Sequence, residues 1–196
     1  MLTFDETTHT YTEDGRKVPG VTHILQVVGL IDFSHIPENR REAALNRGSV
    51  AHKAAELYAV GKLDESTVHP KIIPYLEAYK KFKAENVKEI LGVERRLVSW
   101  KFHYAGTDDQ LILTLKDKIA VIDLKSSVDF SPANDIQLAA YMNLEKEAGT
   151  KPTERITVLL NDDGSYKIFP PKNSFAHDFN VFIATLSIAN WRERNV

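Results

Sequence analysis

Apolar and polar residues recur along the chain with two different periods, which predict helices and strands. Apolar residues between Ile72 and Phe82 recur at helical spacing and predict an amphipathic helix that ends before Val87. Short apolar runs at 111–115 and 119–124, rich in branched residues, predict two strands. Further helices are predicted at 21–29, 38–60, 133–148 and 175–194, and further strands at 3–12, 92–102, 155–160 and 166–169.

This order of elements predicts an α/β fold with a central mixed β-sheet flanked by helices. We expect one domain, in which 1–30 form an N-terminal strand and helix extension, about 38–170 form the core, and 174–196 form a closing helix. In the extension we expect a turn at 13–17, followed by a helix that Pro19 opens and Thr22 caps.

The apolar strand at 119–124 is interrupted by a charged residue, Asp123. An almost continuous apolar run suits a strand that is covered on both faces, where a charge is costly. A polar turn centred near Lys116 would pair this strand antiparallel with the preceding one. Residue numbers across such a hairpin sum to about 232, which places Asp109 opposite Asp123.

Two opposed carboxylates on one face of a hairpin need a counter-charge. Directly opposed side chains have Cβ atoms about 5 Å apart, and like charges at that separation repel. Lys125 lies two residues after Asp123 and therefore projects from the same face. A divalent cation, which prefers oxygen ligands, would complete the charge balance with Asp109 and Asp123. Alternation points Asp108 away from Asp109, so replacing Asp108 is expected to have far less effect.

Simpler interpretations exist for each of these residues taken alone. Asp108 and Asp109 follow Gly106 and could belong to a polar turn. Asp123 and Lys125 could form an exposed ion pair at a strand end, which would contribute little to stability. The combination favours a metal site, because charged groups are rarely buried without partners.

Two pairs of polar residues at helical spacing are further candidates. His52 and Glu56 are four apart in the predicted helix at 38–60, so they share one face, and a neutral imidazole can bind a metal. A local helix pair is the alternative, and for Glu56 we favour it. Gln137 and Tyr141 are also four apart and could position a phosphate or a water, although Tyr141 could equally be a core aromatic.

Four short motifs together resemble one enzyme family. The segments 106–109 (Gly-Thr-Asp-Asp) and 122–125 (Ile-Asp-Leu-Lys) resemble the Gly-x-x-Asp and Asp-x-Lys pair of the PD-(D/E)XK nuclease superfamily. The segment 47–52, which ends in His52, and the segment 137–141 resemble the helical histidine motif and the Gln-x-x-x-Tyr motif of its RecB-like exonuclease branch, found in many phages. Asp-x-Lys alone is unspecific, whereas the four motifs occur in the order of the family.

The resemblance implies a restriction-endonuclease-like core and hydrolysis of DNA phosphodiester bonds with Mg²⁺ or Mn²⁺. It implies a role for each motif residue: metal binding for Asp109, Asp123, the carbonyl of Leu124 and His52, orientation of the attacking water for Lys125, and support of the substrate for Gln137 and Tyr141. It also suggests Glu94, in the preceding strand, as a further ligand, although a solvated strand-edge charge is the alternative. Exonuclease action on linear, double-stranded DNA ends in phage-type recombination or replication follows from the branch alone. The branch also suggests two partners, a single-strand annealing protein and further copies of the chain.

Composition limits the remaining possibilities. The chain has 196 residues, of which 43% are hydrophobic and 27% are charged, as in ordinary soluble domains. Because it has no cysteine, disulfides, thiolate metal sites and the iron–sulfur cluster of some RecB-like nucleases are excluded. No signal-type segment and no long apolar stretch occurs, so we expect a cytoplasmic protein without a membrane partner.

The overall charge gives no general attraction to DNA. The formal net charge is −2 and the isoelectric point is near 6.4. Local basic residues must then attract phosphate, and Arg40, Arg41 and Arg47 lie in or beside the helix that carries His52.

Two other functions fit parts of the pattern. A DNA-end-binding accessory protein for recombination or replication could keep the fold and cleave weakly, but such a protein has no need of two aspartates and a lysine. A retaining glycosidase could use two carboxylates about 5 Å apart. The neighbouring lysine and the presence of just two tryptophans disfavour the glycosidase.

Overall fold

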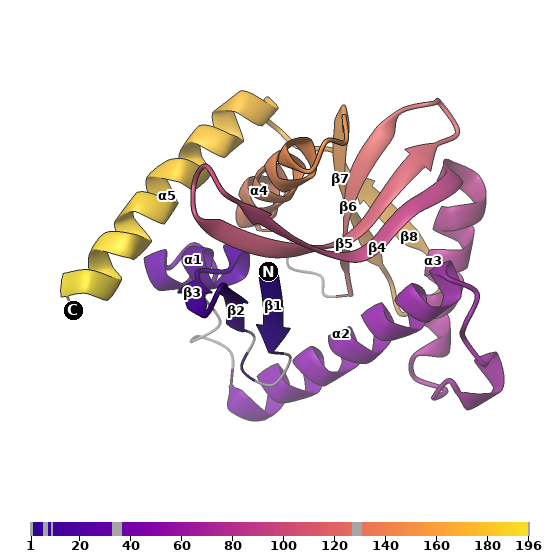
Figure 1. Ribbon diagram of the computed structural model, residues 1–196. Helices are drawn as coiled ribbons and strands as arrows, with labels where there is room; N and C mark the ends of the chain where they lie inside the picture. The colour runs from indigo at the N-terminus through magenta and orange to yellow at the C-terminus, as the bar shows by residue number, and fades with distance from the viewer. Residues whose placement is uncertain (1, 6–7, 9, 33–36, 127–130, 196) are drawn as a thin grey trace.

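The computed structural model describes residues 2–5, 8, 10–32, 37–126 and 131–195, and it has the predicted α/β fold (Figure 1). Its strands are β1 (Leu2–Asp5), β2 (Thr10–Glu13), β3 (Arg16–Val18), β4 (Val87–Ser99), β5 (Tyr104–Thr114), β6 (Ile119–Lys125), β7 (Glu154–Leu160) and β8 (Tyr166–Phe169). Its helices are α1 (Val21–Val28), α2 (Glu38–Ala59), the short 3-10 helix η1 (Glu65–Thr67), α3 (Ile73–Asn86), α4 (Ala133–Glu147) and α5 (Phe175–Asn195).

The central sheet is mixed and has the order β4-β5-β6-β7-β8. All neighbouring strands are antiparallel except β6 and β7, which are parallel and are joined through α4. A parallel pair requires such a crossover connection. In the β5–β6 hairpin Gln110 pairs with Ile122 and Leu111 with Val121, so the register predicted from the turn is confirmed.

Helices cover both faces of the sheet (Figure 1). On one face Ile112, Ile122 and Leu124 pack in a core with residues of α2 and α3. On the other face Leu111 and Val121 pack with residues of α1, α4 and α5. Strand β6 is therefore covered on both sides, as its nearly continuous apolar sequence predicts.

The N-terminal extension differs from its prediction. Instead of one strand at 3–12, β1 and β2 pair antiparallel, and β3 adds a third strand. The chain can reverse after β1 because Asp5 Oδ1 accepts a hydrogen bond from the Thr8 amide at 3.1 Å, a common device of turns. The expected turn at 13–17 is confined to Asp14 and Gly15, both of which have positive φ.

Helix α1 begins and ends close to the predicted bounds, but Thr22 does not cap it. Gly20 is the N-cap residue, without a side-chain cap from any described residue, and Gly29 ends the helix in the left-handed conformation with φ 82°. A parallel bridge between Gly20 and Ala105, with a hydrogen bond from the Ala105 amide to the Pro19 carbonyl, joins the start of α1 to β5. Instead of capping α1, the Thr22 hydroxyl accepts a hydrogen bond from Gln137 of α4.

Strands β4 and β5 are longer than predicted. β4 begins at Val87 rather than near 92, and β5 begins at Tyr104 rather than at 111. Asp108 and Asp109 thus lie within a strand, and the alternative of a polar turn is wrong. The polar residues are tolerated because they face one another across the ladder, as in the pair Arg95 and Asp108.

No helix within the described ranges combines the length and the apolar character needed to cross a membrane.

Candidate functional site

Three carboxylates lie on three neighbouring strands of the central sheet. Across β4 and β5, the pair Arg95 and Asp108 and the pair Val93 and Gln110 flank Glu94 and Asp109, which therefore oppose each other. Across β5 and β6 the ladder ends at the pair Gln110 and Ile122, and Asp109 and Asp123 are the next residues on the two strands, near enough for the Asp109 charge to act on Asp123. Asp109 is thus the central carboxylate, between Glu94 and Asp123.

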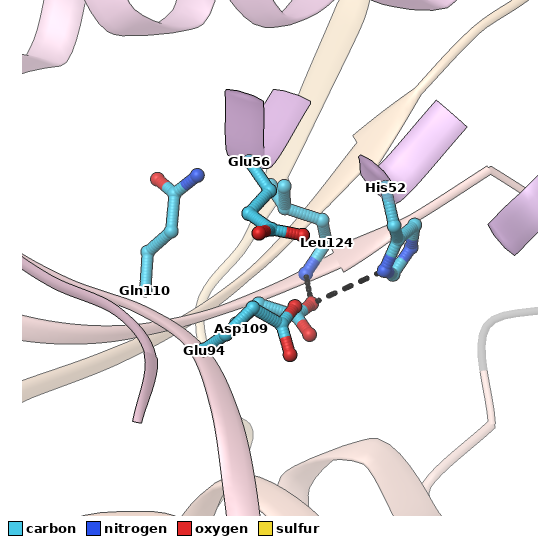
Figure 2. A pocket seen from close by; sticks show the side chains of 6 residues that line it. All are labelled: His52, Glu56, Glu94, Asp109, Gln110 and Leu124. Carbon is cyan, nitrogen blue, oxygen red and sulfur yellow. Dashed lines mark hydrogen bonds and ion pairs between the residues drawn. The ribbon is translucent and has the colours of Figure 1, made fainter. Parts of the chain in front are cut away.

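Asp109 contacts two of the other predicted site residues (Figure 2). Its Oδ2 accepts a hydrogen bond of 2.6 Å from the backbone amide of Leu124. The same oxygen lies 3.7 Å from Nδ1 of His52, a residue of α2. The structure thus brings His52, Asp109 and Leu124 together.

Asp123 and Lys125 form a close ion pair. Lys125 Nζ lies 2.9 Å from each carboxylate oxygen of Asp123, and Asp123 is buried with 3% exposure. Burial and the Asp109 carboxylate raise the pKa of Asp123, while Lys125 opposes that rise. Burial disfavours the charged Lys125 amine, but the carboxylates of Asp123 and Asp109 outweigh this effect and raise its pKa. Lys125 is therefore the counter-charge of both aspartates.

Gln137 and Tyr141 extend this ion pair onto α4. The Gln137 carbonyl oxygen lies 3.4 Å from Lys125 Nζ, and its amide group donates to the Tyr141 hydroxyl at 3.0 Å and to Thr22 Oγ1 at 3.1 Å. Burial raises the pKa of Tyr141 well above its ordinary value, so its hydroxyl remains protonated. Sequence reasoning missed Thr22, because no local spacing indicates a contact between residues 115 positions apart.

Glu94 points toward Asp109 from an unusual backbone conformation. Its φ is 49°, a left-handed value that is uncommon for residues other than glycine. The residue as a whole is exposed, yet burial of the carboxylate and repulsion from Asp109 and Glu56 raise its pKa to about 7.

Glu56 also lines this region. From the sequence we favoured a local helix pair between Glu56 and His52. It is paired instead with Lys53, whose Nζ lies 2.7 Å from both carboxylate oxygens. A pocket between α2 and the sheet is lined by His52, Glu56, Glu94, Asp109, Gln110 and Leu124 (Figure 2).

The donor set suits a hard divalent cation. Carboxylate oxygens and one imidazole are ligands for Mg²⁺ or Mn²⁺, and Asp109, Asp123, Glu94 and His52 supply them here. Within the described ranges, no three His, Asp or Glu side chains already stand in a metal-binding arrangement. In this structure the Leu124 amide donates to Asp109 and the Lys125 amine donates to Asp123, so a cation would share these carboxylates with two hydrogen-bond donors.

Asp108 lies apart from the pocket but is as deeply buried as the site. It is 2% exposed, and neither of its carboxylate oxygens accepts a hydrogen bond from the described residues. Its neighbours are Arg95, opposite it on β4, and Glu145 of α4, which forms an ion pair with Arg95 at 3.1 Å. Burial and repulsion from Glu145 raise the pKa of Asp108 to about 8.

The raised pKa of Asp108 predicts that the protein loses stability as the pH rises. Between about pH 4 and pH 8 the folded chain holds a proton that the unfolded chain has released, so the free energy of unfolding falls over that range. The slope contributed by Asp108 is at most about 1.4 kcal/mol per pH unit. Asp108→Asn should remove this slope and be the more stable protein at pH 8. Urea unfolding of both proteins at several pH values measures how the free energy of unfolding changes with pH. The same slope in both proteins would contradict the raised pKa of Asp108.

Gly106 leaves room for the Tyr141 ring. A Cβ atom at position 106 would lie 2.7 Å from Tyr141 Cε1, which is too close for carbon atoms. Gly106→Ala should therefore lower the free energy of unfolding by about 1–3 kcal/mol and disturb the bond between Tyr141 and Gln137. Gly48→Ala in α2 is the control, because its Cβ would meet the movable Ser126 hydroxyl and alanine favours a helix. Equal stability of the Gly106→Ala and parent proteins in urea would show that the ring can move aside.

Comparison with known proteins adds little to this geometry. No family model matches the chain, and no curated protein matches it. Among solved structures, one titled "Crystal structure of SSO0001" is 18% identical and has a TM-score of 0.32, covering 74% of this chain and 71% of its own. A TM-score this low supports no conclusion about fold or function.

Proposed function

We propose that the chain is a metal-dependent DNA nuclease of the PD-(D/E)XK type, in the RecB-like branch, that acts as an exonuclease on linear DNA ends. The observation that carries the proposal is the position of Glu94, Asp109 and Asp123 side by side on β4, β5 and β6, with Lys125 paired to Asp123. An ordinary structural ion pair does not need three carboxylates for one amine.

The order of elements supports the same proposal. A helix, a three-stranded antiparallel meander, a second helix and a parallel strand are the order expected of a restriction-endonuclease-like core. The chain has this order in α2 and α3, β4 to β6, α4 and β7. The resemblance of the motifs extends the proposal to linear double-stranded DNA as substrate, with an annealing protein and further copies of the chain as partners.

In the proposed reaction Asp109 and Asp123 would hold Mg²⁺ or Mn²⁺, with the Leu124 carbonyl, His52 and Glu94 as further ligands. A cation bound there would supply a water of lowered pKa and would stabilise negative charge on the phosphate. Lys125 keeps its proton beside Asp123 and can donate a hydrogen bond to the attacking water or to the developing charge.

Gln137 and Tyr141 would help to position the Lys125 amine. The Gln137 carbonyl faces Lys125 Nζ while its amide group is held by Tyr141 and Thr22, so the orientation of the amide is fixed. This arrangement keeps the amine directed at the aspartates. Arg47 of α2 is exposed and can meet the phosphate backbone, whereas the side chains of Arg40 and Arg41 lie outside the described residues.

The proposal is tested by incubating the purified protein with linear DNA and with covalently closed circular DNA, in Mg²⁺, Mn²⁺ or a chelator. We expect loss of the linear DNA in either metal, sparing of the circle, and no cleavage in the chelator. The Lys125→Ala protein is the control for a contaminating nuclease. DNA binding without any product under all conditions would instead favour the end-binding accessory protein.

A further inference from the structure

The turn between β4 and β5 carries an exposed tryptophan and is itself closed by hydrogen bonds. Trp100 is 62% exposed, although it is part of a tightly bonded turn. The His103 amide donates to the Ser99 carbonyl at 2.8 Å, and the Phe102 amide donates to Ser99 Oγ at 3.1 Å. Ser99 Oγ in turn donates to Glu147 Oε1 of α4 at 2.9 Å. The backbone turn that carries the exposed indole is therefore held by the sheet and by α4.

A hollow of about 460 Å³ lies beside this tryptophan. Its walls come from three elements and include Leu2 of β1, Leu97 of β4 and Ala148 at the end of α4. This volume lies within the range of about 300–1,000 Å³ that is usual for ligand sites. The hollow thus offers an apolar floor beside an exposed aromatic ring.

Two cationic side chains border the hollow. Arg96 lies with its guanidinium 4.9 Å from the centre of the Phe4 ring, and Lys101 Nζ lies 5.1 Å from that of Phe102. The acidic residue in the lining, Glu147, already accepts hydrogen bonds from Ser99 and Asn143 on Oε1. An exposed aromatic ring and two cations in one lining suit a ligand that has both flat rings and phosphates.

The hollow lies on the same strand as the candidate metal site. Trp100 follows Glu94 by six residues, which at the rise of a strand is about 20 Å. Arg96 lies between them, two residues after Glu94. β4 is an edge strand of the central sheet, and β1 packs against it where Phe4 contacts Arg96.

We propose that this hollow binds a single-stranded DNA segment, with a base stacked on Trp100 and phosphates at Arg96 and Lys101. A duplex hides the faces of its bases, whereas an unpaired base exposes them for stacking. The binding of single-stranded DNA does not depend on the proposed nuclease function. The idea that the bound segment continues from the strand being cut does rest on that function. The hollow would then make a single-stranded tail part of the preferred substrate.

The two tryptophans of the chain provide the test. Trp191 in α5 is 61% exposed, almost the same as Trp100, and does not line the hollow. Trp191→Phe and Trp100→Phe each leave one indole whose fluorescence can be followed while oligodeoxythymidylate is added in a chelator. We expect quenching of Trp100 and none of Trp191. Trp100→Ala should weaken binding about 5- to 150-fold, corresponding to the loss of one base stack, while Trp191→Ala leaves it unchanged.

Failure of single-strand binding at Trp100 can be distinguished from failure of the nuclease proposal. Because the titration is done without metal, a protein that never cleaves DNA can still show quenching of Trp100, and Lys125→Ala should show it as well. Unquenched Trp100, or a duplex of equal length that competes as well as the single strand, would overturn the inference even if cleavage is observed. The quenching experiment decides the matter even if Trp100→Ala fails to fold, because it needs just the conservative phenylalanine variants.

Discussion

Asp109→Asn and Asp123→Asn should each lower metal-dependent cleavage of linear DNA by about 10³-fold, which corresponds to about 4 kcal/mol of transition-state stabilisation. Each substitution keeps the shape of the side chain and removes one of the negative charges that would hold the cation. Because Asp109 and Asp123 repel each other in the metal-free protein, Asp109→Asn should not lower the free energy of unfolding in a chelator, whereas Asp123→Asn should lower it by leaving Lys125 without its ion-pair partner. Initial rates of DNA loss and urea unfolding measure the two effects.

Asp108→Asn is the matched control for these variants. It makes the same chemical change one residue away, in a side chain that is buried but lies outside the pocket lining. We expect it to retain cleavage within a few-fold of the parent protein. If Asp108→Asn lost as much activity as Asp109→Asn, the effect would reflect damage to β5 rather than loss of a metal ligand.

Lys125→Ala should lower cleavage by about 10²- to 10³-fold, as is typical when one preorganised charged donor is removed. The amine balances Asp123 and Asp109, so its loss leaves the buried Asp123 carboxylate without its ion-pair partner and should also lower stability. Binding of Mn²⁺ should be retained, because removal of a positive charge does not disfavour a cation at the same carboxylates.

Lys125→Met distinguishes this role from simple packing. Methionine keeps most of the side-chain volume without the charge, so it should be as inactive as alanine while folding better. Cleavage rate, Mn²⁺ affinity and urea stability are measured together. A methionine variant with nearly full activity would show that Lys125 supports the structure and takes no part in the reaction.

The central hairpin could be predicted from sequence because local rules determine it. The polar turn near Lys116 closes with a hydrogen bond from the Thr114 amide to the Lys118 carbonyl, and Asp117 takes a positive φ. With the turn placed, a side-chain period of two leaves one register for the apolar residues. The position of Asp109 beside Asp123 followed from that counting.

Contacts between distant segments could not be predicted in this way. Strands β4 and β5 continue through polar residues because Arg95, Asp108 and Glu145 face one another in the fold, and single-strand patterns do not contain that information. The contact between Thr22 and Gln137 depends on how α1 is anchored to β5. The left-handed backbone of Glu94 likewise appears in the structure alone.

The central claim is that Asp109 and Asp123 share a divalent cation, and direct titration of the purified protein with Mn²⁺ tests it most simply. Calorimetry should show saturable binding in the parent protein, in Asp108→Asn and in Lys125→Ala, and should show its loss when Asp109 and Asp123 are both replaced by asparagine. Binding that is unchanged in this double variant, or no saturable binding in the parent protein, would contradict the claim.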